Sequence, residues 1–497
     1  MADDMGFSDA GCYGGEIATP NIDALAARGL RFSQFYNNAV CMPTRASLLT
    51  GLYPHQCGIG DACRLRETGN TTIAEVLAGA GYRTLMSGKW HNGNGARELP
   101  TARGFERYWG LLSGSSNYFN PGLRRPWEPE PAHKRPGDTR TWGADRQIIH
   151  PFTPEDPDFY ATDAFTDKAV EFLDRYGRQD APFLLYLAYT APHFPIQARA
   201  EDIERYRGSY LIGWDEVRRR RHARLVEMGL VSKRWGLSDR DELAPSWDDA
   251  ANKDAWDLKM AVYAAMIDRM DQGIGRVMRK LRELGKEEDT MMIFLSDNGG
   301  CAEHIERTPD VPPGPVDSYH TVDAPWANAS NTPFRRFKVF DHEGGISTPF
   351  VISWPRLISK GGGICHDVGH VIDLMPTFLE AAGAHYPSEW GSQGVAPMQG
   401  QSLIPALTGG KLAERPLFWE FRGCRAARVG QWKIVSQGPA RNHVNIPIPP
   451  GRDGWELYDM SADRCETRDL AAEQPEKVRE LDALWREWWG GGSKDSG

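Results

Sequence analysis

The chain is poor in cysteine, and its cysteines lack the spacing typical of a metal-binding module. Only 8 cysteines occur among 497 residues, and no two of them form a Cys-x-x-Cys pair of the kind that holds structural zinc. So few cysteines in so long a chain also exclude a disulfide-dense scaffold. The cysteine content leaves the redox compartment open.

Long apolar segments are missing as well. No window of the sequence reaches the roughly 20 apolar residues that a membrane-spanning helix needs, and the first residues contain no basic stretch followed by an apolar one, as a secretory signal would. We therefore expect no membrane as a partner. As written, the chain predicts a cytoplasmic protein, whereas a periplasmic or secreted location is expected if an N-terminal signal has been lost.

Positive charge is not in excess either. The formal net charge is −9, whereas a protein that binds nucleic acid as its main partner normally presents a basic face to the phosphates. We therefore expect no nucleic-acid partner, although a local cationic pocket is compatible with this charge. The one basic block, Arg218 to Arg221, is predicted to be a solvated face.

The apolar patterns that are present predict an α/β protein. Helical spacing over 162–176 and 255–284 alternates with strand-like apolar runs over 183–189 and 290–295. This alternation favours a mainly parallel mixed central sheet with helices on both faces. Residues 302–337 show no clear element and are expected to form a loop at the functional site.

The length of the chain predicts a second, smaller domain. A single hydrophobic core rarely serves so many residues, and the pattern changes after Gly383. We expect the large α/β domain to span 1–385 and a small domain to span 386–497. Short strand candidates and a helix over 475–489 predict an antiparallel sheet with a closing helix in the small domain.

Polar motifs follow three of the strand candidates. Lys89 and His91 come after the strand predicted over 82–88, His193 comes after the next, and Asp297-Asn298 follows the last. Ligands collect at the carboxyl ends of the strands in such sheets. The sequence therefore predicts that these motifs meet at one functional site.

The most informative segment runs from Cys41-Met42-Pro43-Thr44-Arg45 into Ala46 to Gly51. Pro43 suits the first turn of a helix and Gly51 its exit. Position 41 is then expected beside the positive end of the helix, and Arg45, on the same face, can offer its planar fork of donors to a tetrahedral oxyanion. The alternative is that Cys41 is an ordinary buried thiol.

This segment resembles the signature of the type I sulfatases. The resemblance implies that Cys41 is oxidised to a Cα-formylglycine by a maturation enzyme, and that its aldehyde hydrate attacks the sulfur of a sulfate ester. It also implies an alkaline-phosphatase-like fold, and it covers nearly the whole chain. Position 41 would then carry a nucleophile with two hydroxyls.

The resemblance also implies a metal shell. It carries over Asp3, Asp4, Asp297 and Asn298, completed by the modified residue 41. These residues offer only oxygen ligands, which suit one Ca²⁺ or Mg²⁺ and do not suit zinc. Taken singly, Asp3-Asp4 also fits an acidic terminus, and Asp297-Asn298-Gly299 also fits a turn after a strand.

Further catalytic roles follow from the same resemblance. Lys89, Arg45 and Lys338 would neutralise charge on the transferring group, and Lys338 stands five residues before Glu343-Gly344-Gly345, as in the family. His193, aided by Lys338, would protonate the leaving alcohol. His91 would take the proton from the second hydroxyl of residue 41, which expels sulfate and restores the aldehyde.

The position of Asp3-Asp4 departs from the family pattern, in which a buried apolar strand precedes this pair. Here only Met1 and Ala2 stand before it. We expect that the first central strand is missing before Asp3, and that the main sheet contains an unfilled or distorted slot.

The predicted function is the hydrolysis of aryl or carbohydrate sulfate esters to an alcohol and inorganic sulfate. A phosphonate monoesterase or phosphodiesterase with the same nucleophile is the nearest alternative, because the tetrahedral groups are alike. A non-catalytic binder of sulfated glycans is a third reading. The sequence indicates neither the natural substrate nor the oligomeric state.

Overall fold

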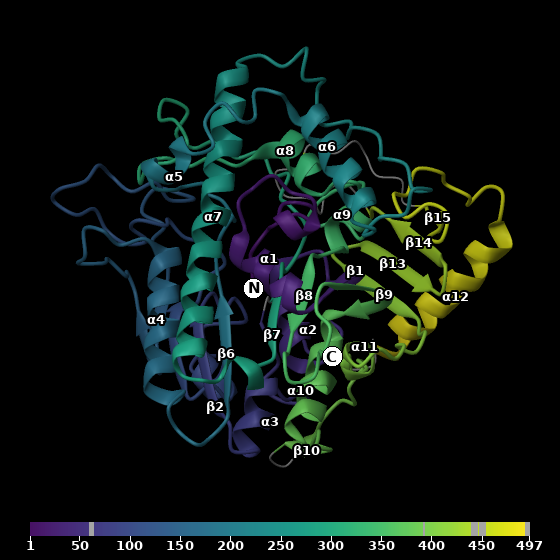
Figure 1. Ribbon diagram of the computed structural model, residues 1–497, viewed down its shortest axis with the longest axis horizontal. Coiled ribbons are helices and arrows are strands. Elements are labelled where there is room, and N and C mark those ends of the chain that lie inside the picture. The colour runs from purple at the N-terminus through teal and green to yellow at the C-terminus, as the bar shows by residue number, and fades with distance from the viewer. Residues whose placement is uncertain (59–63, 391–392, 439–445, 447–453, 493–497) are drawn as a thin grey trace.

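The protein is seen here as a computed structural model that describes residues 1–58, 64–390, 393–438, 446 and 454–492 (Figure 1). Two mixed β-sheets lie side by side in its larger part. The first has the strand order β5-β4-β3-β2-β6, and the second has the order β7-β8-β1-β9. The strands of the first are β2 (Arg83–Gly88), β3 (Arg107–Leu111), β4 (Trp142–Ala144), β5 (Gln147–Ile149) and β6 (Phe183–Ala188). Those of the second are β1 (Leu30–Tyr36), β7 (Met292–Leu295), β8 (Phe350–Ser353) and β9 (Gly363–His370).

Parallel and antiparallel pairs occur in both sheets. β2 pairs in parallel with β3 and β6, and β1 pairs in parallel with β9. β8 is antiparallel to both β1 and β7, and β4 is antiparallel to both β3 and β5. The expected α/β class with a mixed central sheet is confirmed, and antiparallel strands take a larger share of it than the sequence indicated.

Helices cover both faces of the sheets. Along β6 the side chains alternate, so that Leu185 and Leu187 pack toward α4 and α7, whereas Leu184 and Tyr186 pack into the core beneath α2, α3 and α10. This alternation is the two-residue period of a strand. The helices are α1 (Pro20–Arg28), α2 (Cys41–Thr50), α3 (Ile73–Gly79), α4 (Ala161–Tyr176), α5 (Ala200–Glu204), α6 (Trp214–Glu227), α7 (Lys253–Glu283), α8 (Asp323–Ser330), α9 (Glu343–Ile346), α10 (Leu374–Ala382), α11 (Ile404–Leu407) and α12 (Pro475–Gly492). Short 3₁₀ turns span η1 (Gly11–Tyr13), η2 (Pro100–Arg103), η3 (Glu287–Asp289) and η4 (Val371–Asp373).

The first residues of the chain join the two sheets. Ala2 forms a parallel bridge with Ser296, just beyond β7, and Asp3 forms one with Pro192, beyond β6. The Met1 amino group donates a hydrogen bond of 2.8 Å to the Leu187 carbonyl. Burial lowers the pKa of this amino group to about 5. The segment thus delivers Asp3 and Asp4 to the carboxyl ends of the neighbouring strands.

A cavity of about 470 Å³ lies between β6 and β7, and Met1 is one of the residues that line it. It is lined mainly by apolar side chains of these two strands and of the helices on either side, including Leu49, Leu77 and Val277. Among the described residues no strand lies between β6 and β7, so the two sheets are not continuous. That the first central strand is missing before Asp3 stays a prediction.

The C-terminal region forms a second layer beside β9 (Figure 1). An antiparallel sheet of four strands is covered on one face by α12, as the sequence predicted. Its other face packs on Tyr36, Ala39 and Ile346 of the larger part. The domain boundary at 385/386 stays a prediction. The strands are β12 (Leu417–Phe421), β13 (Cys424–Val429), β14 (Trp432–Ser436) and β15 (Glu456–Asp459), and a two-stranded ribbon is formed by β10 (Glu389–Trp390) and β11 (Gln393–Gly394).

Two sequence expectations about local structure were wrong. The segment 302–337 is not only a loop, because Asp323–Ser330 forms the buried helix α8. The basic block is not a uniform solvated face either. Arg219 and Arg220 are exposed, whereas Arg221 is fully buried and pairs with Asp9 at 2.6 Å. None of the described helices is long and apolar enough to cross a membrane.

Candidate active site

Cys41 is the first residue of α2 and is buried. Val40 before it is extended, and Gly51 ends the helix in the left-handed conformation with a φ of 69°, as a C-terminal glycine should. The Cys41 Sγ lies 3.5 Å from His91 Nδ1. Burial raises the pKa of the Cys41 thiol even though Lys89 and Lys338 oppose the shift. The unmodified side chain is therefore a neutral thiol and a weak nucleophile.

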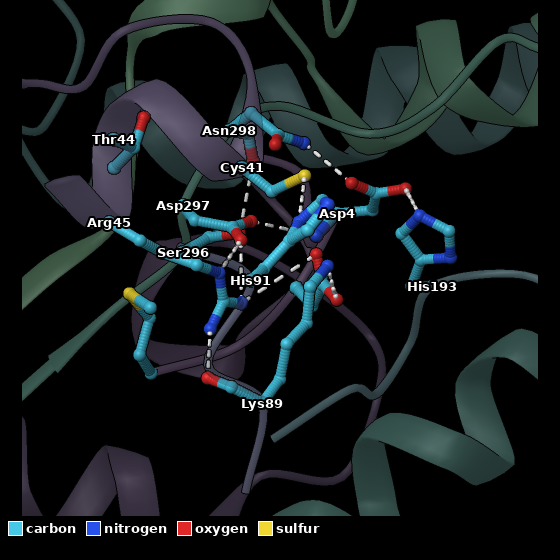
Figure 2. A network of polar contacts seen from close by, with 12 residues as sticks. Asp4, Cys41, Thr44, Arg45, Lys89, His91, His193, Ser296, Asp297 and Asn298 are labelled. Atoms are coloured by element: carbon cyan, nitrogen blue, oxygen red, sulfur yellow. Dashed lines mark hydrogen bonds and ion pairs between the residues drawn. The ribbon is translucent and has the colours of Figure 1, made fainter. Parts of the chain in front are cut away.

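Predicted ligand residues lie close to Cys41, and Figure 2 shows Asp4, Asp297 and Asn298 beside it. Potential ligand atoms of Asp3, Cys41 and Asp297 all lie within 4.8 Å of one another. The Asn298 side-chain amide donates to Asp4 Oδ1 at 2.7 Å. All four residues of the predicted metal shell are at most 1% exposed, so folding has removed three carboxyl groups from water together.

The oxygen atoms of this group fit a hard divalent cation. Asp3 Oδ1 and Asn298 Oδ1 are buried and have no hydrogen-bond partner among the described residues. Such orphaned acceptors are rare in folded proteins and call for an explanation, such as an ion. Carboxylate and amide oxygens are the donors that Ca²⁺ and Mg²⁺ prefer. The donor set therefore agrees with the predicted metal shell.

Two lysines compensate the acidic charge. Lys89 Nζ lies 2.6 Å from Asp3 Oδ2, and Lys338 Nζ lies 2.7 Å from Asp4 Oδ1. Both lysines are at most 5% exposed. Although burial opposes it, Asp4 raises the pKa of Lys338 well above its usual value, so this lysine stays charged. We call the following residues the site cluster: Asp3, Asp4, Arg45, Lys89, Asp297, Asn298 and Lys338.

Arg45 is placed differently from the expectation. Its Nε and Nη2 both donate to Asp297 Oδ2, at 3.0 and 2.7 Å, and its Nη1 donates to the Lys89 carbonyl at 3.0 Å. The fork of donors is thus engaged with the protein and not presented to an oxyanion. Arg45 is fully buried, and its hydrogen bonds orient Asp297 and the backbone just after β2.

The carboxyl groups of the site cluster have divergent acidities. Burial and the neighbouring Asp3 raise the pKa of Asp297 to about 6, against the influence of Arg45. Burial also acts to raise the pKa of Asp4, but His193 and Lys338 outweigh it and lower that pKa. A cation at this position would favour the ionised form of each carboxyl group.

Both predicted histidines border the site cluster. Burial lowers the pKa of His91 well below its usual value, and Lys89 and Arg45 add to the shift. Burial also lowers the pKa of His193 to about 3. His193 Nδ1 donates to the Phe194 carbonyl at 2.6 Å, which leaves Nε2 facing Asp4 Oδ2 at 3.6 Å. Both rings are therefore neutral near pH 7 in the absence of substrate.

Strained backbone conformations occur at and beside several of the site residues. Asp4 and His91 have left-handed φ values of 66° and 56°, and Val339 next to Lys338 has a φ of 89°. Such conformations are unfavourable for residues other than glycine and tend to occur where a site needs an exact side-chain direction. No sequence signal identified these conformations.

Sequence analysis also missed a residue that shapes the turn after β7. Ser296 Oγ donates to the Asn298 carbonyl at 2.9 Å and accepts from the Met5 amide at 3.0 Å. It thereby ties the turn that carries Asp297 to the N-terminal segment. Its place directly before Asp297 was the only available signal.

Comparison with known proteins shows the family to which the chain is similar. Residues 1–384 match the family described as Sulfatase, and residues 335–486 match the one described as N-sulphoglucosamine sulphohydrolase, C-terminal. An arylsulfatase of Klebsiella aerogenes is 35% identical over 430 residues, which cover 81% of this chain and 90% of the relative. An uncharacterised sulfatase of Schizosaccharomyces pombe is 32% identical, and the match covers 98% of this chain and 91% of the relative.

Solved structures show the same fold. The crystal structure of Ps i-CgsB in complex with k-i-k-neocarrahexaose superposes with a TM-score of 0.70 at 25% identity, over 100% of this chain and 93% of that chain. Sequence and fold thus agree with these proteins over nearly the full length. The chain belongs to the sulfatase family, and it is a sulfuric ester hydrolase of the arylsulfatase-like kind.

Proposed function

We propose that this protein hydrolyses aryl or carbohydrate sulfate esters with a formylglycine made from Cys41 and one bound Ca²⁺. The observation that carries the proposal is the meeting of Cys41, Asp3 and Asp297 within 4.8 Å, with His91 beside the sulfur atom. An unmodified thiol in this place has a raised pKa, so a cysteine alone explains the site poorly.

Asp3, Asp4, Asp297 and Asn298 would hold the cation. Its oxygen-only ligand set and the two orphaned acceptors support Ca²⁺, with Mg²⁺ as the alternative. When bound, the cation would polarise the sulfate oxygens, and the hydrated aldehyde at residue 41 would supply the nucleophilic oxygen. Arg45 would keep Asp297 oriented toward this position through its two hydrogen bonds.

The lysines and histidines supply charge and protons. Lys89 and Lys338 bring two buried positive charges to the position that the sulfate group would take, where a low dielectric strengthens their effect. His193 Nε2 would deliver a proton to the leaving alcohol, since the bound anion favours the protonated ring and so raises its pKa. His91, which is neutral, would take a proton from the modified side chain as sulfate leaves, so that the aldehyde is restored.

The substrate class rests on similarity to relatives. The Klebsiella relative is named as an arylsulfatase, and the solved structure with 25% identity holds a carbohydrate ligand. The proposal also requires a maturation enzyme as a partner, because oxidising a thiol to an aldehyde needs an oxidant that the site does not supply. The cytoplasmic location stays a prediction.

Mass and turnover test the proposal together. The protein is isolated from a host that contains a formylglycine-generating enzyme, and the peptide with residue 41 is expected to have the mass of the aldehyde or its hydrate. The wild type should release sulfate from 4-nitrophenyl sulfate, and Cys41→Ala should lower kcat/KM by on the order of 10⁴ or more.

The same preparation separates the alternatives. Turnover of an aryl phosphonate well above that of the aryl sulfate would favour the phosphonate monoesterase. An unmodified thiol in the native host, together with binding of a sulfated glycan without turnover, would favour the non-catalytic binder. Cys41→Ala serves both comparisons, because it removes the nucleophile and leaves the cationic groups in place.

A further inference from the structure

The short helix α9 (Glu343–Ile346) lies between two segments that carry site residues. On one side the Gly299 amide, in the turn after Asp297 and Asn298, donates to the Gly345 carbonyl at 3.0 Å. On the other side the Gly344 amide donates to the Arg335 carbonyl at 2.8 Å, at the start of the loop that leads to Lys338. α9 is therefore hydrogen-bonded to both segments.

Close backbone packing makes these contacts rigid. A Cβ atom on Gly299 would lie 1.9 Å from the Gly344 carbonyl oxygen, and one on Gly345 would lie 1.9 Å from the Phe340 carbonyl oxygen. A Cβ on Gly344 would lie 2.2 Å from the Arg336 carbonyl oxygen. With so little space, a shift of α9 displaces the turn and the loop together.

The loop with Lys338 needs support from outside itself. Arg336 and Val339 have left-handed φ values of 64° and 89°, and a branched side chain is especially unfavourable there. Strained conformations persist only where the surrounding structure enforces them. The Lys338 amide donates to the Gly300 carbonyl at 3.1 Å, so this loop is also tied directly to the turn with Asn298.

α9 itself is held by a buried group of charges that we call the interface cluster: Glu343, Lys433, Arg464 and Glu466. Glu343 Oε1 accepts from Lys433 Nζ at 2.9 Å. Glu343 Oε2 accepts from Tyr36 and Ser347 hydroxyls and from Arg464 Nε, at 2.8 to 3.0 Å. Burial opposes ionisation of Glu343, but Lys433 and Arg464 outweigh it and lower its pKa to about 2.

The interface cluster also holds the first turn of α9. Glu466 Oε2 accepts from the Glu343 amide at 2.9 Å, and Glu466 Oε1 accepts from Lys433 Nζ at 2.7 Å. All four members of the cluster are fully buried. Lys433 lies on β14, and Arg464 and Glu466 follow β15, so three of the four come from the C-terminal region beside α9 (Figure 1).

We propose that Lys433, Arg464 and Glu466 are positioning residues for the active site. Through Glu343 and α9 they set the turn that carries Asp297 and Asn298 and the loop that carries Lys338. The C-terminal region thus helps to build a site to which it contributes no predicted metal ligand or catalytic side chain. This inference rests on the proposed function for its catalytic consequence, whereas its structural consequence does not.

Lys433→Met tests the proposal, because it removes the charge and keeps a long side chain. Hydrogen exchange of the full-length protein should show faster exchange at the Gly299 and Lys338 amides than in the wild type. Calorimetric titration with Ca²⁺ should show an affinity lower by about tenfold or more, the usual effect of losing an outer-shell partner. With 4-nitrophenyl sulfate, kcat should fall by about tenfold or more.

Arg103→Met is the matched control. Arg103 is also buried and pairs with Glu75 at 3.0 Å, and its other hydrogen bonds go to Asn70 and to the Arg66 carbonyl. This variant should lose about as much thermal stability as Lys433→Met. Its amide exchange at Gly299, its Ca²⁺ affinity and its kcat should nevertheless match those of the wild type. The control therefore separates positioning from a general loss of stability.

Ser347→Ala is the milder second variant if Lys433→Met does not fold. It removes a hydroxyl that links Glu343 to Arg464 at 2.9 and 2.8 Å. Amide exchange at Gly299 and Lys338 should be several-fold faster than in the wild type, and Ca²⁺ affinity and kcat should be several-fold lower. Unchanged exchange at Gly299 and Lys338 in the folded variants would overturn the inference. Faster exchange in a protein whose wild type neither binds Ca²⁺ nor hydrolyses sulfate esters would uphold the positioning and overturn the proposed function instead.

Discussion

The site cluster and the interface cluster are both groups of fully or nearly fully buried charges, but their hydrogen bonding differs. In the interface cluster Glu343 accepts four hydrogen bonds, and no polar side-chain atom of its four members lacks a partner among the described residues. In the site cluster two oxygens, Asp3 Oδ1 and Asn298 Oδ1, have none. A buried cluster whose polar atoms are all hydrogen-bonded is consistent with a structural role, whereas buried acceptors without a hydrogen-bond partner indicate a ligand.

The surroundings of the two clusters differ in backbone conformation. Each cluster contains one left-handed residue, Asp4 in the site cluster and Glu466 in the interface cluster, whereas two further left-handed residues, His91 and Val339, lie beside the site cluster. Strain of this kind is stored where function needs it and is compensated by the surrounding packing. The interface cluster and α9 are one source of that compensation.

Among changes within the two clusters, the largest effect is expected from Asp3→Asn. It removes the negative charge of one predicted metal ligand. Lys89 thereby loses the anionic partner that lies 2.6 Å from its Nζ. We expect kcat/KM for 4-nitrophenyl sulfate to fall by on the order of 10³, with little measurable Ca²⁺ binding by calorimetry. Wild-type Ca²⁺ affinity in this variant would contradict the assignment of Asp3 as a ligand.

The next largest effect is expected from Glu343→Gln. Neutralising one partner of a buried ion pair leaves Lys433 and Arg464 partly uncompensated, which typically lowers the free energy of unfolding by about 3–5 kcal/mol. Urea denaturation measures the change. Glu473→Gln is the control, because Glu473 pairs with Arg468 on the surface and should change stability by less than about 0.5 kcal/mol. Equal shifts in both variants would contradict the special role of the interface cluster.

The interface cluster should also make stability sensitive to acid. The pKa of Glu343 is lowered from 4.5 to about 2 in the folded protein, so its stabilisation is present above pH 4.5 and is lost as the pH falls toward 2. A shift of this size corresponds to about 3 kcal/mol at most. Unfolding measured between pH 5 and pH 2.5 should show a weaker pH dependence in Glu343→Gln. The same slope in both proteins would exclude Glu343 as the group responsible.

The smallest effect is expected from adding Ca²⁺, measured as a change in the stability of the folded protein. Ca²⁺ at about 100 times its dissociation constant should stabilise the folded protein by about 2.7 kcal/mol, seen as a higher Tm, and a chelator should reverse the shift. Glu343→Gln should keep part of this response, whereas Asp3→Asn should lose it. A similar Tm shift in Asp3→Asn would place the ion somewhere other than the site cluster.

Local elements were largely predictable from the sequence because their signals are local. Thr72 caps α3 through a capping box with Glu75, and Gly51 ends α2. The apolar periodicity of α4, α7 and β6 also matched the observed elements closely. Arg221 escaped prediction because its partner Asp9 lies 212 residues away, so its burial depends on a contact that no local pattern contains.

The sequence by itself determined the chemistry available to this protein: the Cys41 segment, the predicted acidic and amide ligands, the two lysines and the two histidines. Only the tertiary structure decided their arrangement, including the engagement of Arg45 with Asp297 and the support of the site through Glu343 and Lys433. The physical reason is that residue type sets charge and hydrogen-bonding capacity, whereas desolvation and partner choice depend on segments that meet only after folding.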